Sequence, residues 1–273
     1  MQPRPTVTGK DKQMPYDSHL REFSPAERPR IPVAERLIVA LDLPEIDQAR
    51  SLIRKLHHVV HAFKIGFHLW IAEGADDLIS DLLKEGKKVF IDAKMYDIEN
   101  TVEWAVRAAA KRRISFVTVH YNEKVVRAAV KGKGDSDIKI FVVPLLTMLD
   151  EENLRAMGVV DRTAGQYIIS NTEKALDAGC DGVIVSPTDD IQSLKDLAKR
   201  KGKQLLVATP GVRPEGVQTN DHRRFGTPST AIRNGADYLI VGRPIYEKDD
   251  PAQAARDIIR EMELADAEIS EPV

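Results

Sequence analysis

Residues 90–101 read FIDAKMYDIENT, and this stretch places a carboxylate and an ammonium at the end of an apolar run. Side chains alternate between the two faces of a β-strand, so Asp92 and Lys94 are expected to point the same way. Burying two such charges is costly unless they are paired. The stretch therefore predicts a strand that ends at a functional site, with a surface ion pair as the plain alternative.

The apolar run before Asp92 belongs to a series of short, β-branched runs separated by amphipathic segments. Near-continuous apolar runs are typical of parallel strands that are buried on both faces. Between them, residues 46–56 and 102–110 have helical spacing of apolar side chains. Helix-start residues stand at 150–153, and helix-stop residues at 178–179 and 234–235. The predicted strands cover residues 37–41, 62–65, 88–92, 115–119, 139–143, 182–185, 205–208 and 238–241.

Eight such βα units predict an α/β protein whose parallel strands close into a (β/α)8 TIM barrel. The barrel is expected to form a single catalytic domain over residues 34–273. An open, doubly wound sheet is the rival architecture, and it is weaker because no G-x-G-x-x-G motif follows the first strand. Residues 1–33 contain six prolines among charged residues. They are expected to form a flexible or loosely docked N-terminal extension, or else an irregular arm packed on the body or on a partner subunit.

Composition and charge limit the classes of partner that the protein is expected to bind. The formal net charge of −2 gives no electrostatic argument for nucleic acid or an anionic membrane, so neither partner is expected. No apolar run approaches the roughly 20 residues needed to span a bilayer. The single cysteine, Cys180, excludes an intramolecular disulfide and fits a cytoplasmic location. Trp70 and Trp104 are expected to be packing residues on their helices.

Charged side chains stand at the first three predicted strand ends. They are Asp42, Lys64 and the trio Asp92, Lys94 and Asp97. In TIM barrels, active residues lie where strands end and βα loops begin. An alternation of acids and bases lets each charge lower the desolvation cost of its neighbour. This pattern predicts one charged pocket, although each residue alone has a structural explanation such as a helix cap.

The last two strand ends differ in chemistry. Gly211 and Gly242 let the backbone approach a ligand closely, and Arg243 offers a fork for phosphate oxygens. Barrel loops after the seventh and eighth strands frequently hold a phosphate. These residues therefore predict a phosphorylated ligand. The remaining strand ends carry His120, Thr147, Ser186 and Thr209-Pro210.

Together these residues resemble the orotidine 5′-phosphate decarboxylase family. The resemblance runs from about residue 36 to 262, and the D-x-K-x-x-D element with its D-I-x-N-T continuation is its most specific part. It implies cofactor-independent decarboxylation of orotidine 5′-monophosphate to UMP in pyrimidine biosynthesis by a homodimer, with no metal. It implies catalytic roles for Lys94, Asp92, Asp97 and Lys64. The substrate-binding residues that it implies are Asp42, Thr101, Thr147, Pro210, Gly211, Gln218, His222, Gly242 and Arg243.

The resemblance also implies how the groups divide the work. Asp42 would hold a ribose hydroxyl, while Asp97 and Thr101 would reach into the partner's site. Gln218 or His222 would replace a glutamine that the family uses to bridge phosphate and base. The chemistry of the residues agrees, because loss of CO₂ leaves a carbanion that a fixed ammonium such as Lys94 can stabilise and then protonate.

Two other functions remain open from the sequence. One is a metal-dependent sugar-phosphate decarboxylase or aldolase of the same superfamily, in which the carboxylates would hold Mg²⁺. The other is a non-catalytic nucleotide-binding barrel. It is suggested by four departures from the family pattern, which lie after His120, after Thr147, at the bridging glutamine near His222 and in the extension over residues 1–33. The loop from Val212 to Phe225 is expected to close over the ligand.

Overall fold

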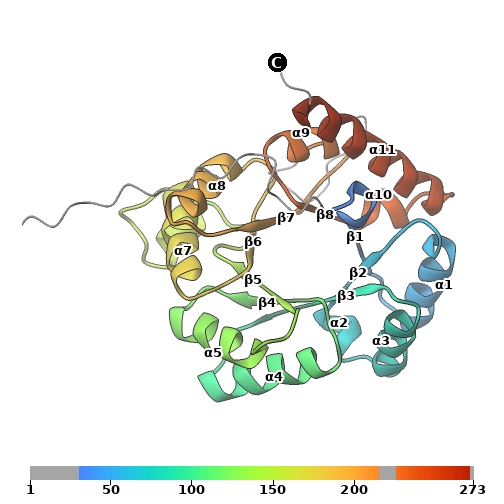
Figure 1. The fold of residues 1–273 in the computed structure, drawn as a ribbon, viewed down its shortest axis with the longest axis horizontal. Helices are drawn as coiled ribbons and strands as arrows, with labels where there is room; N and C mark the ends of the chain where they lie inside the picture. Colours follow the sequence, from blue (N-terminus) through green and yellow to red (C-terminus); the bar gives the residue numbers. More distant parts are fainter. Residues whose placement is uncertain (1–30, 215–225, 271–273) are drawn as a thin grey trace, which may run out of the picture. The chain divides into compact units, whose positions relative to one another are not determined.

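Eight parallel strands form a closed barrel in the computed structural model, which describes residues 31–214 and 226–270. Each strand pairs with its neighbour in sequence, and the last pairs with the first (Figure 1). In this closing pair, Val39 lies opposite Val241. The predicted TIM barrel is confirmed and the open sheet is wrong. The strands are β1 (Leu37–Ala40), β2 (Ala62–Gly66), β3 (Lys88–Met95), β4 (Phe116–His120), β5 (Lys139–Val143), β6 (Gly182–Ile184), β7 (Leu206–Pro210) and β8 (Tyr238–Val241).

Helices surround the ring of strands on its outside (Figure 1). The helix predicted over residues 46–56 has these bounds, and the predicted helix starts and stops near 150, 178 and 234 are confirmed. None of the described helices is long and apolar enough to cross a membrane. The helices are α1 (Ile46–Leu56), α2 (Phe67–Trp70), α3 (Ala75–Lys84), α4 (Glu99–Lys111), α5 (Glu123–Lys133), α6 (Glu151–Ala156), α7 (Ala164–Asp177), α8 (Ile191–Arg200), α9 (Pro228–Arg233), α10 (Arg243–Tyr246) and α11 (Pro251–Ser270), with a 3-10 turn, η2, at Val33–Glu35.

Most of the predicted N-terminal extension lies outside the described residues. Of residues 1–33, the structure describes the last three. Ile31 is partly buried against the barrel interior, and Val33 begins η2. The boundary at residue 33 and the role of the segment before it stay predictions.

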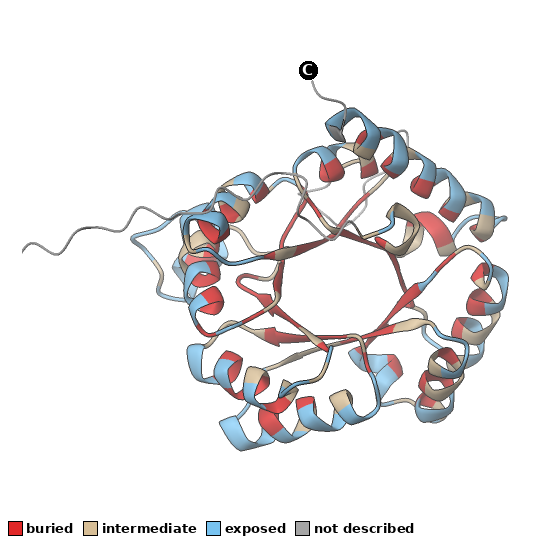
Figure 2. Cartoon of the chain, in the orientation of Figure 1, coloured by how far each residue is buried: buried red, intermediate tan, exposed pale blue. Residues whose placement is uncertain are grey.

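The core has two layers. Side chains on the outward faces of the strands pack against the helices, and these contacts make the larger apolar cluster. Figure 2 shows that the strands and the helix faces turned toward them are buried, while the outer helix faces are exposed. The inward faces hold a smaller cluster dominated by four aromatic rings, Phe90, Phe116, Phe141 and Tyr238. The ring centroids of Phe116 and Tyr238 are 5.3 Å apart, and those of Phe90 and Phe116 are 5.7 Å apart. This aromatic plug fills the barrel, and Phe90 also lines the cavity beside it.

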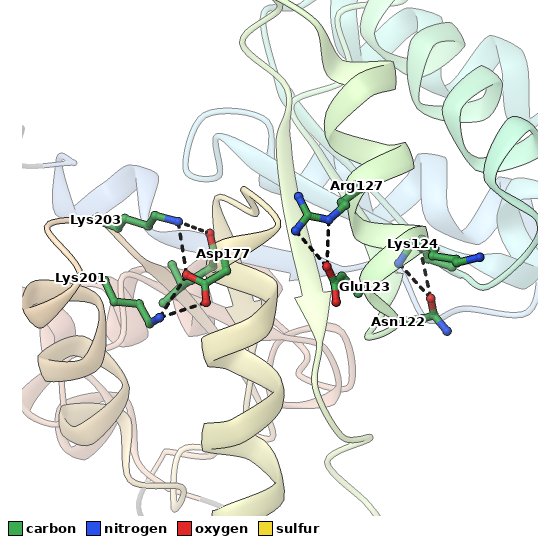
Figure 3. Close-up of polar contacts among 9 residues, drawn as sticks. Asn122, Glu123, Lys124, Arg127, Asp177, Lys201 and Lys203 are labelled. Carbon is green, nitrogen blue, oxygen red and sulfur yellow. Dashed lines mark hydrogen bonds and ion pairs between the residues drawn. The ribbon is translucent and has the colours of Figure 1, made fainter. Parts of the chain in front are cut away.

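Polar contacts hold the helix ends in place. Asn122 accepts a hydrogen bond from the backbone N–H of Lys124 at 3.0 Å and so caps the start of α5 (Figure 3). At the end of α7, Asp177 pairs with the Lys201 ammonium at 3.0 Å, and Lys203 lies beside the same carboxylate. Exposed pairs of this kind stabilise little, so they orient the loops more than they stabilise the fold.

Gly132 allows α4 and α5 to pack closely, and this gives a stability prediction. A Cβ atom at residue 132 would lie 2.4 Å from the backbone oxygen of Glu103. Gly132→Ala is therefore expected to destabilise the protein by about 1–3 kcal/mol, as overpacking does. The measurement is the free energy of unfolding from urea denaturation.

Gly165 is the matched control, because it lies in α7 with open space around it and its nearest neighbour is 4.0 Å away. Gly165→Ala is expected to stabilise the protein by up to about 1 kcal/mol through helix propensity. Equal effects of the two substitutions would contradict the packing argument.

Candidate active site

Beyond the aromatic plug, the inward-facing positions at the ends of the first three strands carry charged side chains. Asp42 lies two residues after the inward-facing Ala40 of β1, and Asp92 lies two residues after the inward-facing Phe90 of β3. Lys64 is the charged residue on the inward face of β2. Because neighbouring strands are parallel, these positions converge at the same end of the barrel. The expectation that strand ends share one pocket is confirmed for these residues, which line a common cavity.

An unbroken chain of charge pairs crosses this cavity. The Lys64 ammonium lies 2.9 Å from Asp42 Oδ1 and 3.3 Å from Asp92 Oδ2. The Lys94 ammonium donates to the same Asp92 Oδ2 at 2.8 Å. Lys64 and Asp92 are mostly buried, so each needs its opposite charge to offset desolvation. The acids and bases that alternate in the sequence are therefore paired with one another in space as one charge array.

The array favours the charged forms of its two most buried members, Lys64 and Asp92. Burial by itself would lower the pKa of Lys64, but the adjacent Asp42 and Asp92 carboxylates outweigh burial and raise that pKa above its usual range. Burial likewise opposes ionisation of Asp92, yet Lys64 and Lys94 lower the pKa of this carboxyl below its ordinary value. These shifts favour the ammonium form of Lys64 and the carboxylate form of Asp92 at neutral pH.

Lys94 reaches the cavity by an unusual backbone conformation. Its φ angle is 45°, in the left-handed region that costs a non-glycine residue about 1–2 kcal/mol. The register between β3 and β4 shifts here, from Ile91 opposite Val117 to Met95 opposite Val119. The predicted strand over residues 88–92 accordingly extends to Met95 as a bulged strand. Asp92 and Lys94 do meet, but through this bulge and not through simple strand alternation.

The far side of the cavity has the residues expected for phosphate. Gly211 has a φ of 78°, a left-handed conformation that favours glycine. At residue 242, a Cβ atom would lie 3.2 Å from the Tyr246 ring, so glycine lets β8 pass closely beside α10. The cavity, of about 320 Å³, has the size of a small-molecule site. Predicted residues that line it are Asp42, Lys64, Asp92, Lys94, Thr147, Pro210, Gly211, Gly242 and Arg243.

Two further predicted residues, Asp97 and Thr101, do not line this cavity. Asp97 is exposed and lines a separate open hollow, and Thr101 is exposed on α4. Gln218 and His222, with nearly all of the predicted closing loop, lie outside the described residues. The prediction that Trp104 is a packing residue is wrong, because this side chain is 62% exposed and faces outward from α4.

The sequence did not single out three residues that belong to the site. Arg213 and Tyr246 line the cavity, and Thr118 hydrogen-bonds to Asp92. Tyr246 lies three residues after Arg243 on α10, a spacing that places both on one helix face. Thr118 shares the inward face of β4 with Phe116, so strand alternation gives the direction of its side chain but not its contact with Asp92.

His120 stands at the end of β4, beside the charge array. Burial and the nearby Lys94 ammonium lower its pKa, against the opposing effect of Asp92. This shift favours the neutral form of its ring. The ring contacts Tyr96, with centroids 6.4 Å apart.

Comparison with known proteins identifies the family. Residues 35–258 match the model of the orotidine 5′-phosphate decarboxylase / HUMPS family. The chain belongs to this family. It is 43% identical over 228 residues to an orotidine 5′-phosphate decarboxylase of Nitrobacter winogradskyi, covering 84% of this chain and 92% of that protein. It is 40% identical to the enzyme of the same name from Jannaschia sp., covering 84% and 98% of the two chains.

A solved structure agrees with the fold. The crystal structure of orotidine 5′-phosphate decarboxylase from Lactobacillus acidophilus superposes with a TM-score of 0.71 at 33% identity, covering 84% of this chain and 99% of that one. The family name joins two kinds of enzyme, and the relatives at about 40% identity carry the name of the first.

Proposed function

We propose that this protein decarboxylates orotidine 5′-monophosphate to UMP, a step of pyrimidine biosynthesis, as a carboxy-lyase that uses no cofactor. The observation that carries the proposal is the Lys94 ammonium, held 2.8 Å from Asp92 in a cavity that also contains Arg243 and Gly211. A phosphorylated pyrimidine nucleotide has groups that match both sides of this cavity. The name shared by the relatives supports the same substrate.

The chemistry follows from the charges. Breaking the bond between C6 and the carboxylate leaves an electron pair on C6 of the pyrimidine, and CO₂ departs. The Lys94 ammonium stabilises this developing charge and then donates a proton to C6, which completes UMP. Asp92 holds Lys94 in position, and Lys64 keeps Asp92 ionised. Because the array is assembled before substrate arrives, little reorganisation is needed during the reaction.

The substrate contacts are part of the proposal. Asp42 binds a ribose hydroxyl, and Thr147 lies along the nucleotide. Arg243 and the backbone of Pro210, Gly211 and Gly242 hold the phosphate, which supplies binding energy remote from C6. Gln218 or His222 takes the place of the family's bridging glutamine.

The proposal is tested by following the loss of orotidylate absorbance with purified protein, with and without EDTA. Turnover that survives EDTA supports it. Turnover of a sugar phosphate that EDTA abolishes would favour the metal-dependent alternative. Tight binding of UMP with unchanged orotidylate absorbance over hours would favour the non-catalytic binder. Within the described residues, no group of three or more His, Cys, Asp or Glu side chains is arranged to hold a metal ion.

We also propose that two copies of the chain form a cytoplasmic homodimer with shared sites. Large apolar side chains are exposed on α2 and on the segment from β3 into α4, and α2 contacts β3. Exposed apolar groups of this size favour a protein partner. Asp97 and Thr101 lie on the same segment, and both are exposed. A second copy on this face would bring these two residues to its neighbour's cavity. The exposed side chains are Phe67, Trp70, Ile71, Tyr96, Ile98 and Trp104.

Mixing two inactive variants tests the shared site. Lys94→Ala and Asp97→Ala are each expected to be inactive, but a mixed dimer has one site with both native residues. After full subunit exchange, roughly a quarter of wild-type activity is expected, because half of the dimers are mixed and half of their sites are intact.

Lys94→Ala mixed with Asp92→Ala is the matched control. Both residues come from the same chain, so no mixed dimer has an intact site and activity stays absent. Verified subunit exchange without recovery in the first mixture would refute the shared site.

A further inference from the structure

Thr118 stands where the regular pairing of β3 with β4 is interrupted. Three residues of β3 separate Ile91 from Met95, whereas Thr118 alone separates Val117 from Val119 on β4. The extra residues of a bulge lose their ladder partners. The side chain of Thr118 is fully buried and faces this bulge.

The hydroxyl of Thr118 makes two hydrogen bonds that join the two key residues of the site. Its oxygen accepts the backbone N–H of Lys94 at 2.9 Å. Its proton is donated to Asp92 Oδ1 at 2.8 Å. A hydroxyl can do both at once, because it has one donor and two acceptor positions. The other oxygen of Asp92, Oδ2, is left for the Lys94 and Lys64 ammonium groups.

These bonds determine where the Lys94 ammonium stands. The left-handed backbone at Lys94 is strained, so the surrounding structure has to hold it in place. The bond from its N–H to Thr118 does so, while the bond from Thr118 to Asp92 fixes the plane of the carboxylate that receives the ammonium. We propose that Thr118 is a positioning residue for decarboxylation, which acts by holding the Lys94 backbone and the Asp92 carboxylate in one rigid unit.

The inference rests on the proposed function and has its own test. Thr118→Val keeps the branched shape and removes both hydrogen bonds, whereas Thr118→Ser keeps the hydroxyl. In Thr118→Val, kcat is expected to fall roughly 100-fold, as small misplacements of a reacting group do. KM and the affinity for UMP are expected to change little, because phosphate is held on the far side of the cavity. Thr118→Ser is expected to retain kcat within a few-fold of the wild type.

A second measurement needs no substrate. Hydrogen exchange at the Lys94 backbone amide is expected to be roughly five- to thirtyfold faster in Thr118→Val than in the wild type, because the amide loses its acceptor. Exchange at Leu239, a buried β8 amide bonded to the backbone of Arg36, is the internal control for global stability.

The outcomes separate this inference from the proposed function. Wild-type protein that leaves orotidylate intact would refute the function, and the exchange measurement would then decide the role of Thr118. Active wild type with unchanged kcat in Thr118→Val would overturn the inference alone. A loss of kcat that Thr118→Ser shares in full, or unchanged exchange at Lys94, would also overturn it.

Discussion

Lys94→Ala is expected to reduce decarboxylation of orotidine 5′-monophosphate by about 10⁴-fold or more. The substitution removes both the charge that stabilises the C6 carbanion and the proton that quenches it, and each contribution is large. It also leaves the mostly buried Asp92 with Lys64 as its single ammonium partner among the described contacts. The measurement is kcat from orotidylate absorbance, alongside the affinity for UMP, which reports whether the site still forms.

Lys88→Ala is the matched control for this experiment. Lys88 begins the same strand and pairs with Glu35 at 2.6 Å, but it lies at the opposite end of the barrel. Its removal is expected to leave kcat within a few-fold of the wild type. Equal rates for Lys94→Ala and wild type would remove Lys94 from the mechanism.

Arg243→Ala is expected to produce the second large effect, through the substrate's phosphate. Truncating one partner of a buried, charge-assisted pair costs about 2–4 kcal/mol, so kcat/KM for orotidine 5′-monophosphate should fall roughly 30- to 1,000-fold. Orotidine, which has no phosphate, should show the same kcat/KM with both proteins. Measuring both substrates therefore isolates the interaction between Arg243 and phosphate from any general damage to the site.

Arg260→Ala on α11 serves as the control, because this arginine is exposed and does not line the cavity. It should be neutral with both substrates. An equal loss with orotidine and its 5′-phosphate in Arg243→Ala would show that Arg243 supports the fold of the site and does not bind phosphate.

Much of the fold and of the site could be predicted because it follows from local patterns. The eight apolar runs indicated the strands, and polar or glycine residues at six of the strand ends line the cavity, from Asp42 through Arg243. His120 and Ser186, at the ends of the fourth and sixth strands, do not line it. Strand order followed from the choice of a barrel over an open sheet, because consecutive strands are neighbours throughout a (β/α)8 barrel. The bulge at Lys94 was not predictable, because a shift in register depends on how β3 meets β4.

Thr118 was overlooked for the same reason. Thr118 looks like one more β-branched strand residue until its hydroxyl is seen between Asp92 and the Lys94 amide. Trp104 was assigned to packing because large aromatic residues are usually buried, yet it lies on the outer face of α4. Gln218 and His222 lie outside the described residues, so their roles stay predictions.

The sequence by itself determined the type of each group and the end of the barrel where it stands, because every parallel strand delivers its last residue to the same rim. Only the tertiary structure decided which groups touch. Closure of β8 onto β1 brings Gly242 and Arg243 into one cavity with Asp42, and the bulged pairing of β3 with β4 aims Lys94 at Asp92. The barrel closure and the bulge both depend on contacts between strands. The side-chain periodicity along a single strand does not determine such contacts.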